Sequence, residues 1–168
     1  MSPENIGNVL GALSEWVKDQ VEGAVASEEL NLAEASALSH LSKYPDQSIE
    51  SVRAPLGLSH SGCVRLVDRL AQGGYVERRV GKDARTVALH LTRRGRKFVE
   101  AAAERRAEAL ARALHVLDPG EREHLGQLLS KLLERSVPRA SKALEVCLLC
   151  DYGACVECPF KGFTAPGR

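Results

Sequence analysis

One stretch in the middle of the chain limits the fold more than any other, because its hydrophobic period changes from helical to strand-like. Apolar residues recur every three or four positions over 48–56 and again over 60–72, which predicts two short helices. Gly57-Leu58-Ser59 separates them, and this sequence is typical of a tight turn. Alternating patterns over 75–80 and 86–91 then predict the two strands of a hairpin. Two short helices and a hairpin in this order predict a winged helix-turn-helix unit.

Longer helical patterns flank this unit on both sides. Pro3 precedes the first, Asn31 and Glu34 predict a capping box at the start of the second, and Pro119 opens the last. The expected fold is mainly α: a winged helix-turn-helix with a small β-hairpin wing, plus N- and C-terminal dimerisation helices. We divide the chain into an N-terminal dimerisation helix (1–30), the winged helix-turn-helix domain (31–97), C-terminal dimerisation helices (98–138) and a cysteine-rich metal-binding tail (139–168).

The first and last long helices carry more apolar surface than a small monomer would bury. Each has an apolar stripe at helical spacing. We expect the two stripes to pair across two copies of the chain, which makes a homodimer; packing within one chain is the alternative. The stripes consist of Leu125, Leu128, Leu129, Leu132 and Leu133 in the last helix and Val9, Leu13, Trp16 and Val17 in the first.

The net charge of +1 conceals an uneven distribution. Residues 1–52 contain two Lys or Arg against nine Asp or Glu, whereas residues 53–97 contain eleven against three. This basic block is typical of a surface that faces nucleic acid. A basic face that contacts only solvent is the alternative interpretation.

The second short helix and the hairpin contain the residues predicted to contact double-stranded DNA. A helix fits the major groove with its N-terminal end toward bases and phosphates, where small residues allow a close approach. A basic loop between two strands can enter the narrow minor groove. The predicted DNA-binding residues are Ser59, His60, Ser61, Gly62, Arg65 and Arg69 in the helix and Arg78, Arg79, Lys82 and Arg85 in the hairpin.

Three residues of the second short helix have two interpretations each. Ser59 also stands where an N-cap is expected, and one hydroxyl can serve both purposes. For Arg69, the alternative to a phosphate contact is a surface ion pair with Asp68 or Glu77. Cys63 points to the core side of the helix, which favours a buried structural residue over a redox sensor.

The middle of the chain resembles the core of the MarR family of transcriptional regulators over the segment GLSHSGCVRLVDRLAQGGYVERRVGKDARTVALHLTRRGR. That family has, in the same order, a helix-turn-helix, LVDRLxxxGYVER, a wing containing D-x-R, and LTxxGR. The last two motifs are Asp83-Ala84-Arg85 and Leu91-Thr92-Arg93-Arg94-Gly95 in this chain. The resemblance is dense over 55–97 and compatible in helix order over roughly 5–137.

The resemblance implies a homodimer whose terminal helices interlock, with each winged unit on half of a pseudo-palindrome. It also implies regulation by a small-molecule effector, often an aromatic acid, or by cysteine oxidation. By the same resemblance Arg85 enters the minor groove and Asp83 orients an arginine of the wing. Ser59, His60, Ser61 and Arg65 fall where the recognition contacts of the family fall.

Four cysteines near the C-terminus, Cys147, Cys150, Cys155 and Cys158, have the spacing C-x2-C-x4-C-x2-C. Two C-x-x-C turns can close a tetrahedral site of four thiolates, and Gly153 allows the chain to reverse between them. Zinc is the expected metal because structural all-thiolate sites usually bind zinc. An iron–sulfur cluster and a metal-free dithiol switch are the alternatives. The MarR pattern does not include this segment.

Other classes of protein agree less well with the sequence. There is no recognisable nucleophile–base–acid set or phosphate loop, so we do not expect an enzyme. There is no apolar run of membrane-spanning length and no visible secretory signal, so we expect a cytoplasmic protein with no membrane partner. The expected function is that of a repressor released by a ligand, redox or metal signal. The alternative is a metal-handling or thiol-redox sensor protein centred on the cysteine cluster, although such a protein does not need the basic block.

Overall fold

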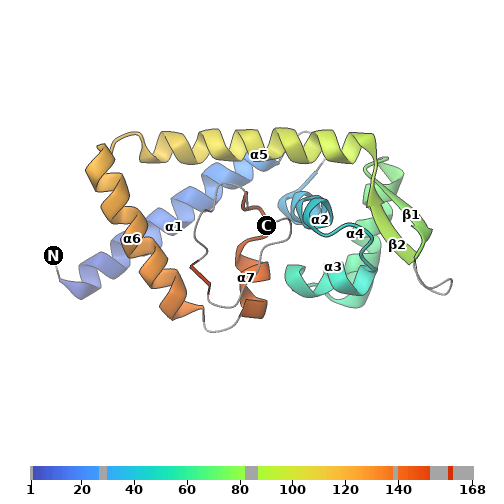
Figure 1. Ribbon diagram of the computed structural model, residues 1–168, viewed down its shortest axis with the longest axis horizontal. Helices are drawn as coiled ribbons and strands as arrows, with labels where there is room; N and C mark the ends of the chain where they lie inside the picture. Colours follow the sequence, from blue (N-terminus) through green and yellow to red (C-terminus); the bar gives the residue numbers. More distant parts are fainter. Residues whose placement is uncertain (1, 27–29, 82–86, 138–139, 152–158, 161–168) are drawn as a thin grey trace.

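The protein is described by a computed structural model over residues 2–26, 30–81, 87–137, 140–151 and 159–160. The elements in chain order are α1 (Pro3–Val25), α2 (Leu32–Lys43), α3 (Ile49–Leu56), α4 (His60–Gln72), β1 (Val76–Val80), β2 (Val87–Leu91), α5 (Arg93–Leu114), α6 (Pro119–Ser136) and α7 (Ala140–Val146). The prediction of a mainly helical winged helix-turn-helix is confirmed. In Figure 1, α5 runs along one side of the molecule, with α3, α4 and the hairpin at one end and α1 and α6 at the other.

Side chains at the helix starts determine where the helices begin. The capping box at α2 is formed in both directions: the Glu34 amide donates to Asn31 Oδ1 and the Asn31 amide donates to Glu34 Oε2, each at 3.0 Å. Ser48, Ser59, Thr92 and Asp118 each accept a hydrogen bond from the backbone three residues on. These caps agree with the sequence, because a cap depends only on residues within one helical turn.

The hairpin is antiparallel, with Val76 opposite Leu91 and Val80 opposite Val87. The alternation predicts that Val87, Leu89 and Leu91 share one face of the strand, and the regular pairing of β2 agrees with this. Along that face burial varies: Leu89 is fully buried and Leu91 half-buried, but Val87 is 47% exposed. Val87 lies at the outer end of the hairpin beside the exposed Val80, beyond the reach of the helices that cover Leu89.

The main core lies between α2, α3, α4 and the hairpin. Its most deeply buried side chains include Leu38, Val52, Leu66, Leu70 and Leu89, and all of these are at most 2% exposed. Phe98 and Val99 at the start of α5 also pack against this core, and burial of each such side chain is worth about 1.5–3 kcal/mol.

A second, smaller cluster joins the winged unit to the long helices. It consists of Val25 at the end of α1, Ala35 in α2 and Ala102 in α5, with Leu149 packed against them. Arg105 reinforces this junction by donating from Nε to the carbonyl of Ala24 at 2.7 Å. Within the described residues, the structure contains no helix with the length and hydropathy needed to cross a membrane.

Candidate nucleic-acid interface

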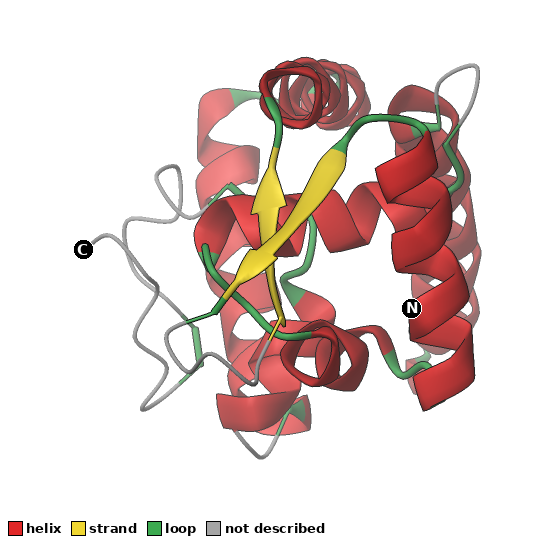
Figure 2. Ribbon diagram, turned by 90° about the vertical axis from the view of Figure 1, so that its right-hand side faces the viewer, coloured by secondary structure: helices red, strands yellow, loops and turns green. Residues whose placement is uncertain are grey.

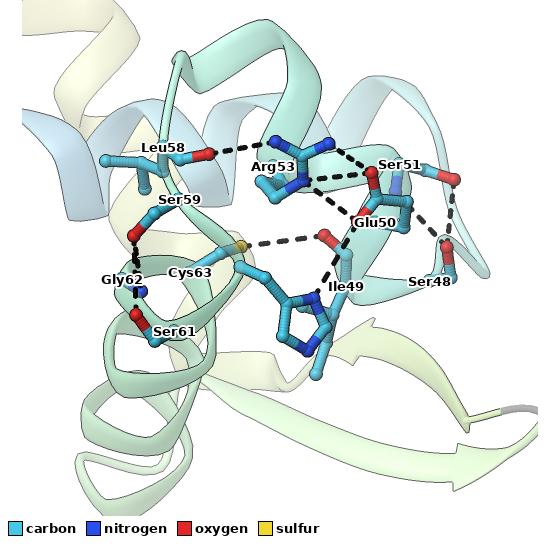
Figure 3. Close-up of polar contacts among 11 residues, drawn as sticks. Ser48, Ile49, Glu50, Ser51, Arg53, Leu58, Ser59, Ser61, Gly62 and Cys63 are labelled. Atoms are coloured by element: carbon cyan, nitrogen blue, oxygen red, sulfur yellow. Dashed lines mark hydrogen bonds and ion pairs between the residues drawn. The ribbon is translucent and has the colours of Figure 1, made fainter.

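The turn between α3 and α4 is held rigidly by the backbone and by Arg53. Gly57 has a left-handed conformation (φ 64°, ψ 24°), which favours glycine, and its amide donates to the carbonyls of Ala54 and Arg53. The Arg53 guanidinium donates from Nη1 to the Leu58 carbonyl at 3.1 Å and from Nε to both oxygens of Glu50 at 2.9 Å (Figure 3). The ion pair with Arg53 holds the pKa of the Glu50 carboxyl below its usual range. The direction in which α4 leaves the turn is therefore fixed relative to α3.

The first turn of α4 presents small polar groups. Ser59 Oγ accepts from the Gly62 amide at 3.1 Å, so its predicted capping role is confirmed, and it lies 3.4 Å from Ser61 Oγ (Figure 3). A Cβ at Gly62 would lie 3.0 Å from Ser59 Oγ, so a larger residue there would press on the cap. The His60 side chain is 72% exposed, and its Nδ1 is 3.7 Å from Glu50 Oε2.

The two faces of α4 divide as the sequence predicts. Cys63, Leu66 and Leu70 are buried, whereas Ser61, Arg65 and Arg69 are exposed. Cys63 donates from Sγ to the Ile49 carbonyl at 3.5 Å, and burial raises the pKa of its thiol, which agrees with the expected core role. Arg65 has no ion pair within the part of the chain that the structure describes, so its guanidinium is available to a partner.

Arg69 forms an ion pair with neither of the two partners considered from the sequence. Its Nε donates to Glu34 Oε1 at 2.7 Å, and the Glu34 side chain is only 5% exposed. Asp68 instead binds Arg78 at 2.7 Å, and Glu77 binds Arg79 on the same strand. The expectation of Asp68 or Glu77 was wrong because the start of α2 lies against α4, which brings a buried carboxylate beside Arg69.

The predicted wing residues Lys82, Asp83 and Arg85 lie outside the described residues. The strands that carry them project away from the core, since Val80 at the end of β1 is 76% exposed. Figure 2 views the molecule from this side and shows the hairpin in front of the helices. The roles of these three residues remain predictions, as do DNA contacts by Ser59, His60, Ser61, Gly62, Arg65, Arg69, Arg78 and Arg79.

Comparison with known proteins relates this arrangement to a family. The sequence pattern of the MarR family matches residues 29–86, from just before α2 to the residue before β2. Over these residues the chain is similar to the MarR family. It is 28% identical, over 79% of its length and 78% of the relative's, to the uncharacterized HTH-type transcriptional regulator YfiV of Bacillus subtilis.

Solved structures share the fold. RV1404 from Mycobacterium tuberculosis matches with a TM-score of 0.72 and 26% identity, covering 80% of this chain and 94% of that one. A Staphylococcus aureus MepR mutant bound to an oligodeoxyribonucleotide matches with a TM-score of 0.60 and 18% identity, covering 78% and 97%.

The MarR motif after the wing has a structural role that the sequence alone did not reveal. Thr92 Oγ donates to the Gly74 carbonyl at 2.7 Å and accepts from the Gly95 amide at 3.1 Å. The Arg94 guanidinium stacks over the Tyr75 ring at 4.4 Å and donates to the Gly73 carbonyl at 2.9 Å. These contacts clamp the start of α5 onto the turn before β1. Only the cap formed by Thr92 follows from its local sequence.

The first two cysteines of the tail lie together after α7. The Cys150 amide donates to the Cys147 carbonyl at 3.1 Å, which forms a tight turn. A hydrogen bond from Cys147 and the positive charges of Arg106 and Lys43 lower the pKa of the Cys150 thiol to about 6, against the opposing effect of burial. Two thiols at this spacing suit a soft metal ion. Cys155 and Cys158 lie outside the described residues, and the described part of the chain groups no three His, Cys, Asp or Glu side chains for a metal.

A cleft of about 530 Å³ lies between α2 and α5, next to this cysteine pair. The lining is mostly apolar, and its charged side chains are of both signs: Lys43, Glu100, Arg106 and Asp151. The cleft therefore combines an apolar wall with balanced charge.

Proposed function

We propose that this chain is a MarR-type transcriptional regulator, which binds a pseudo-palindromic operator as a homodimer and represses transcription. The observation that carries the proposal is the first turn of α4, where small polar residues precede the exposed Arg65 on a rigid turn. Such a helix end can approach base edges closely while its N-terminus attracts phosphate. The likeness to the DNA-bound MepR mutant supports the same geometry at the level of the fold.

The homodimer is supported by the apolar faces that one chain leaves uncovered. Ile6, Val9, Leu13 and Trp16 in α1 are 46–53% exposed. In α6, Leu128, Leu129 and Leu132 are 41–49% exposed. An uncovered apolar surface of this kind marks an interface, and a twofold dimer places two recognition helices on two half-sites about 34–36 Å apart.

The proposal is tested by measuring how a substitution of Arg85 changes binding to duplex DNA. We expect Arg85 to contact the minor groove. We expect Arg85→Ala to weaken binding of an in vitro selected duplex by about 1–3 kcal/mol, because a wing contact is lost. Arg112→Ala is the matched control, since Arg112 is exposed far along α5 beside Glu108. Equal affinity of both variants for the duplex in a gel-shift titration would remove the wing from the interface.

Release from the operator is proposed to follow from a change in the spacing of the two winged units. A small, mainly apolar molecule suits the α2–α5 cleft, because apolar groups line it and its charged side chains are of both signs. A small increase in the distance between the two winged units is enough to prevent one of them from reaching its half-site. The second cluster of Val25, Ala35 and Ala102 is the junction at which such an increase would act.

For the tail we propose one zinc ion held by Cys147, Cys150, Cys155 and Cys158. Zinc bound to four thiolates supplies folding energy to a segment with little core of its own. We expect Cys155→Ser to lower the zinc content measured on freshly purified protein, while the winged unit stays folded by circular dichroism. If the protein is brown and contains iron and sulfide, the four cysteines hold an iron–sulfur cluster instead of zinc. If it contains no metal, the dithiol switch is the remaining interpretation.

A further inference from the structure

The chain folds back on itself after α6 and covers the α2–α5 cleft with its own residues. Leu149, Cys150 and Asp151 contribute to the lining of this cleft. We call residues 140–151, which comprise α7 and the turn with the first two cysteines, the C-terminal strap. In Figure 1, α7 lies on the side of the molecule opposite α5, next to α3.

Two donors from α2 hold the backbone of the strap. Ser39 Oγ donates to the Leu148 carbonyl at 2.8 Å, and Lys43 Nζ donates to the same oxygen at 2.6 Å. Lys43 Nζ also donates to the Cys147 carbonyl at 3.3 Å. A carbonyl that accepts two hydrogen bonds, one from a cation, is anchored in one position.

The other contacts of the strap reach the long helices and α3. Arg106 in α5 donates from Nη2 to Cys150 Sγ at 3.8 Å. Leu149 packs against the cluster that joins α1, α2 and α5. On its other side α7 packs against α3, and Ala143 is fully buried. The strap therefore touches both the winged unit and the long helices on which the proposed dimer depends.

We propose that the C-terminal strap is a built-in ligand of the α2–α5 cleft, which fastens the winged unit to the long helices and fixes the angle at which α4 meets DNA. The proposal rests on the DNA binding proposed above. If the two winged units of a dimer are held at a fixed angle, both can bind their half-sites with little further loss of conformational entropy. If the winged units are loosely attached, that entropy is lost on binding and the affinity for two half-sites is lower. Two of the anchored groups belong to Cys147 and Cys150, so a metal held by these thiols would be attached at the anchor itself.

Two full-length variants are designed to release the strap, one by removing its hydrogen bonds to α2 and the other by disrupting its apolar contact. Ser39→Ala with Lys43→Met removes both donors to the Leu148 carbonyl, and Leu149→Asn places a polar group in the apolar cluster. Ser42→Ala is the control, because the Ser42 hydroxyl donates within α2 to the Ser39 carbonyl. Amide hydrogen exchange over 143–151 measures whether the strap is docked.

Affinity is then measured for a duplex with two half-sites, selected in vitro by the wild-type chain, and for a shorter duplex with one half-site. We expect both variants to exchange faster in the strap and to bind the two-site duplex about tenfold more weakly, with unchanged affinity for the one-site duplex. The one-site duplex also controls for the lost charge of Lys43, which would weaken binding to both.

The proposal is overturned by a released strap with unchanged two-site affinity, by a gain in two-site affinity, or by strap exchange that neither variant accelerates. Equal losses on both duplexes would also overturn it, since they indicate damage to the winged unit itself. If the wild-type chain selects no duplex, the proposed function fails instead, and the two failures are thereby distinguished.

Discussion

The fit between the wing and α5 depends on a single hydrogen atom in place of a side chain at Gly95. A Cβ there would lie 2.2 Å from the Tyr75 carbonyl oxygen. This oxygen belongs to the backbone, so it cannot move aside as the end of a flexible side chain could. We expect Gly95→Ala to lower the free energy of unfolding by about 1–3 kcal/mol in urea titrations, as overpacking of a tight contact does. Gly23→Ala is the control: nothing lies within 4 Å of its Cβ position, so it should be neutral or stabilising by up to about 1 kcal/mol. Equal stability of the two variants would mean that the junction is not tightly packed.

Buried His40 makes the fold sensitive to acid. It stacks on Tyr44 with ring centroids 4.9 Å apart, and burial, followed by the charge of Lys43, lowers its pKa from the ordinary 6.5. The folded state therefore keeps His40 neutral while the unfolded state takes up a proton, so stability is complete above pH 6.5 and falls as the pH drops below it. We expect His40→Phe to reduce the loss of melting temperature on acidification, compared with the wild type. The same loss in both proteins would assign the acid sensitivity to other groups.

Contacts between neighbouring residues were predictable, and contacts between distant ones were not. The capping box of Asn31 and Glu34 follows from a spacing of three residues. The ion pair of Arg69 with Glu34 joins residues 35 positions apart, and only the core to which α2 and α4 both contribute brings them together. The same limit explains why the sequence indicated the cysteine tail but not the place where Lys43 and Ser39 hold it.

Among the elements, the α3–α4 turn sets the direction of the proposed recognition helix α4. Gly57 has positive φ with no atom within 4 Å of its Cβ position, so substitution there costs backbone energy and causes no clash. We expect Gly57→Ala to lower the free energy of unfolding by about 1–2 kcal/mol. Asparagine tolerates this conformation better, so Gly57→Asn should lose less. A larger loss for asparagine than for alanine would show that crowding, not the left-handed backbone, limits this turn.

The hairpin shows which features of a strand can be predicted from an alternating sequence pattern and which cannot. Its position and pairing agree with the alternating sequence, because turn and strand signals are local. Burial changes along β2, because Leu89 in its middle is next to the helices while Val87 at its outer end extends beyond them. A sequence pattern predicts which side chains share a face of a strand, but the extent of the neighbouring core decides which of them are buried.

For the assembled molecule, the apolar face of α6 allows a direct test of the dimer. Leu132 is 49% exposed in a single chain, so an aspartate there does not disturb the core of the monomer. We expect Leu132→Asp to sediment as a monomer at micromolar concentration while the wild type sediments as a dimer, because a charge in an apolar interface is strongly unfavourable. Lys131→Asp, on the polar side of the same helix, should remain dimeric. A dimeric Leu132→Asp variant would place the interface elsewhere.

The central claim is that two copies of α4 read the base edges of one DNA duplex, and selection from random duplexes tests it most directly. We expect the wild-type chain to enrich an inverted repeat with half-site centres about 10 base pairs apart, since a dimer spans one helical turn. Arg65→Ala should relax the preference at one position in each half-site, because an arginine contact to a base carries about 1–3 kcal/mol of discrimination. Enrichment of no inverted repeat, or the same base preferences with a uniformly weaker affinity for Arg65→Ala, would contradict this account of α4 as the recognition helix.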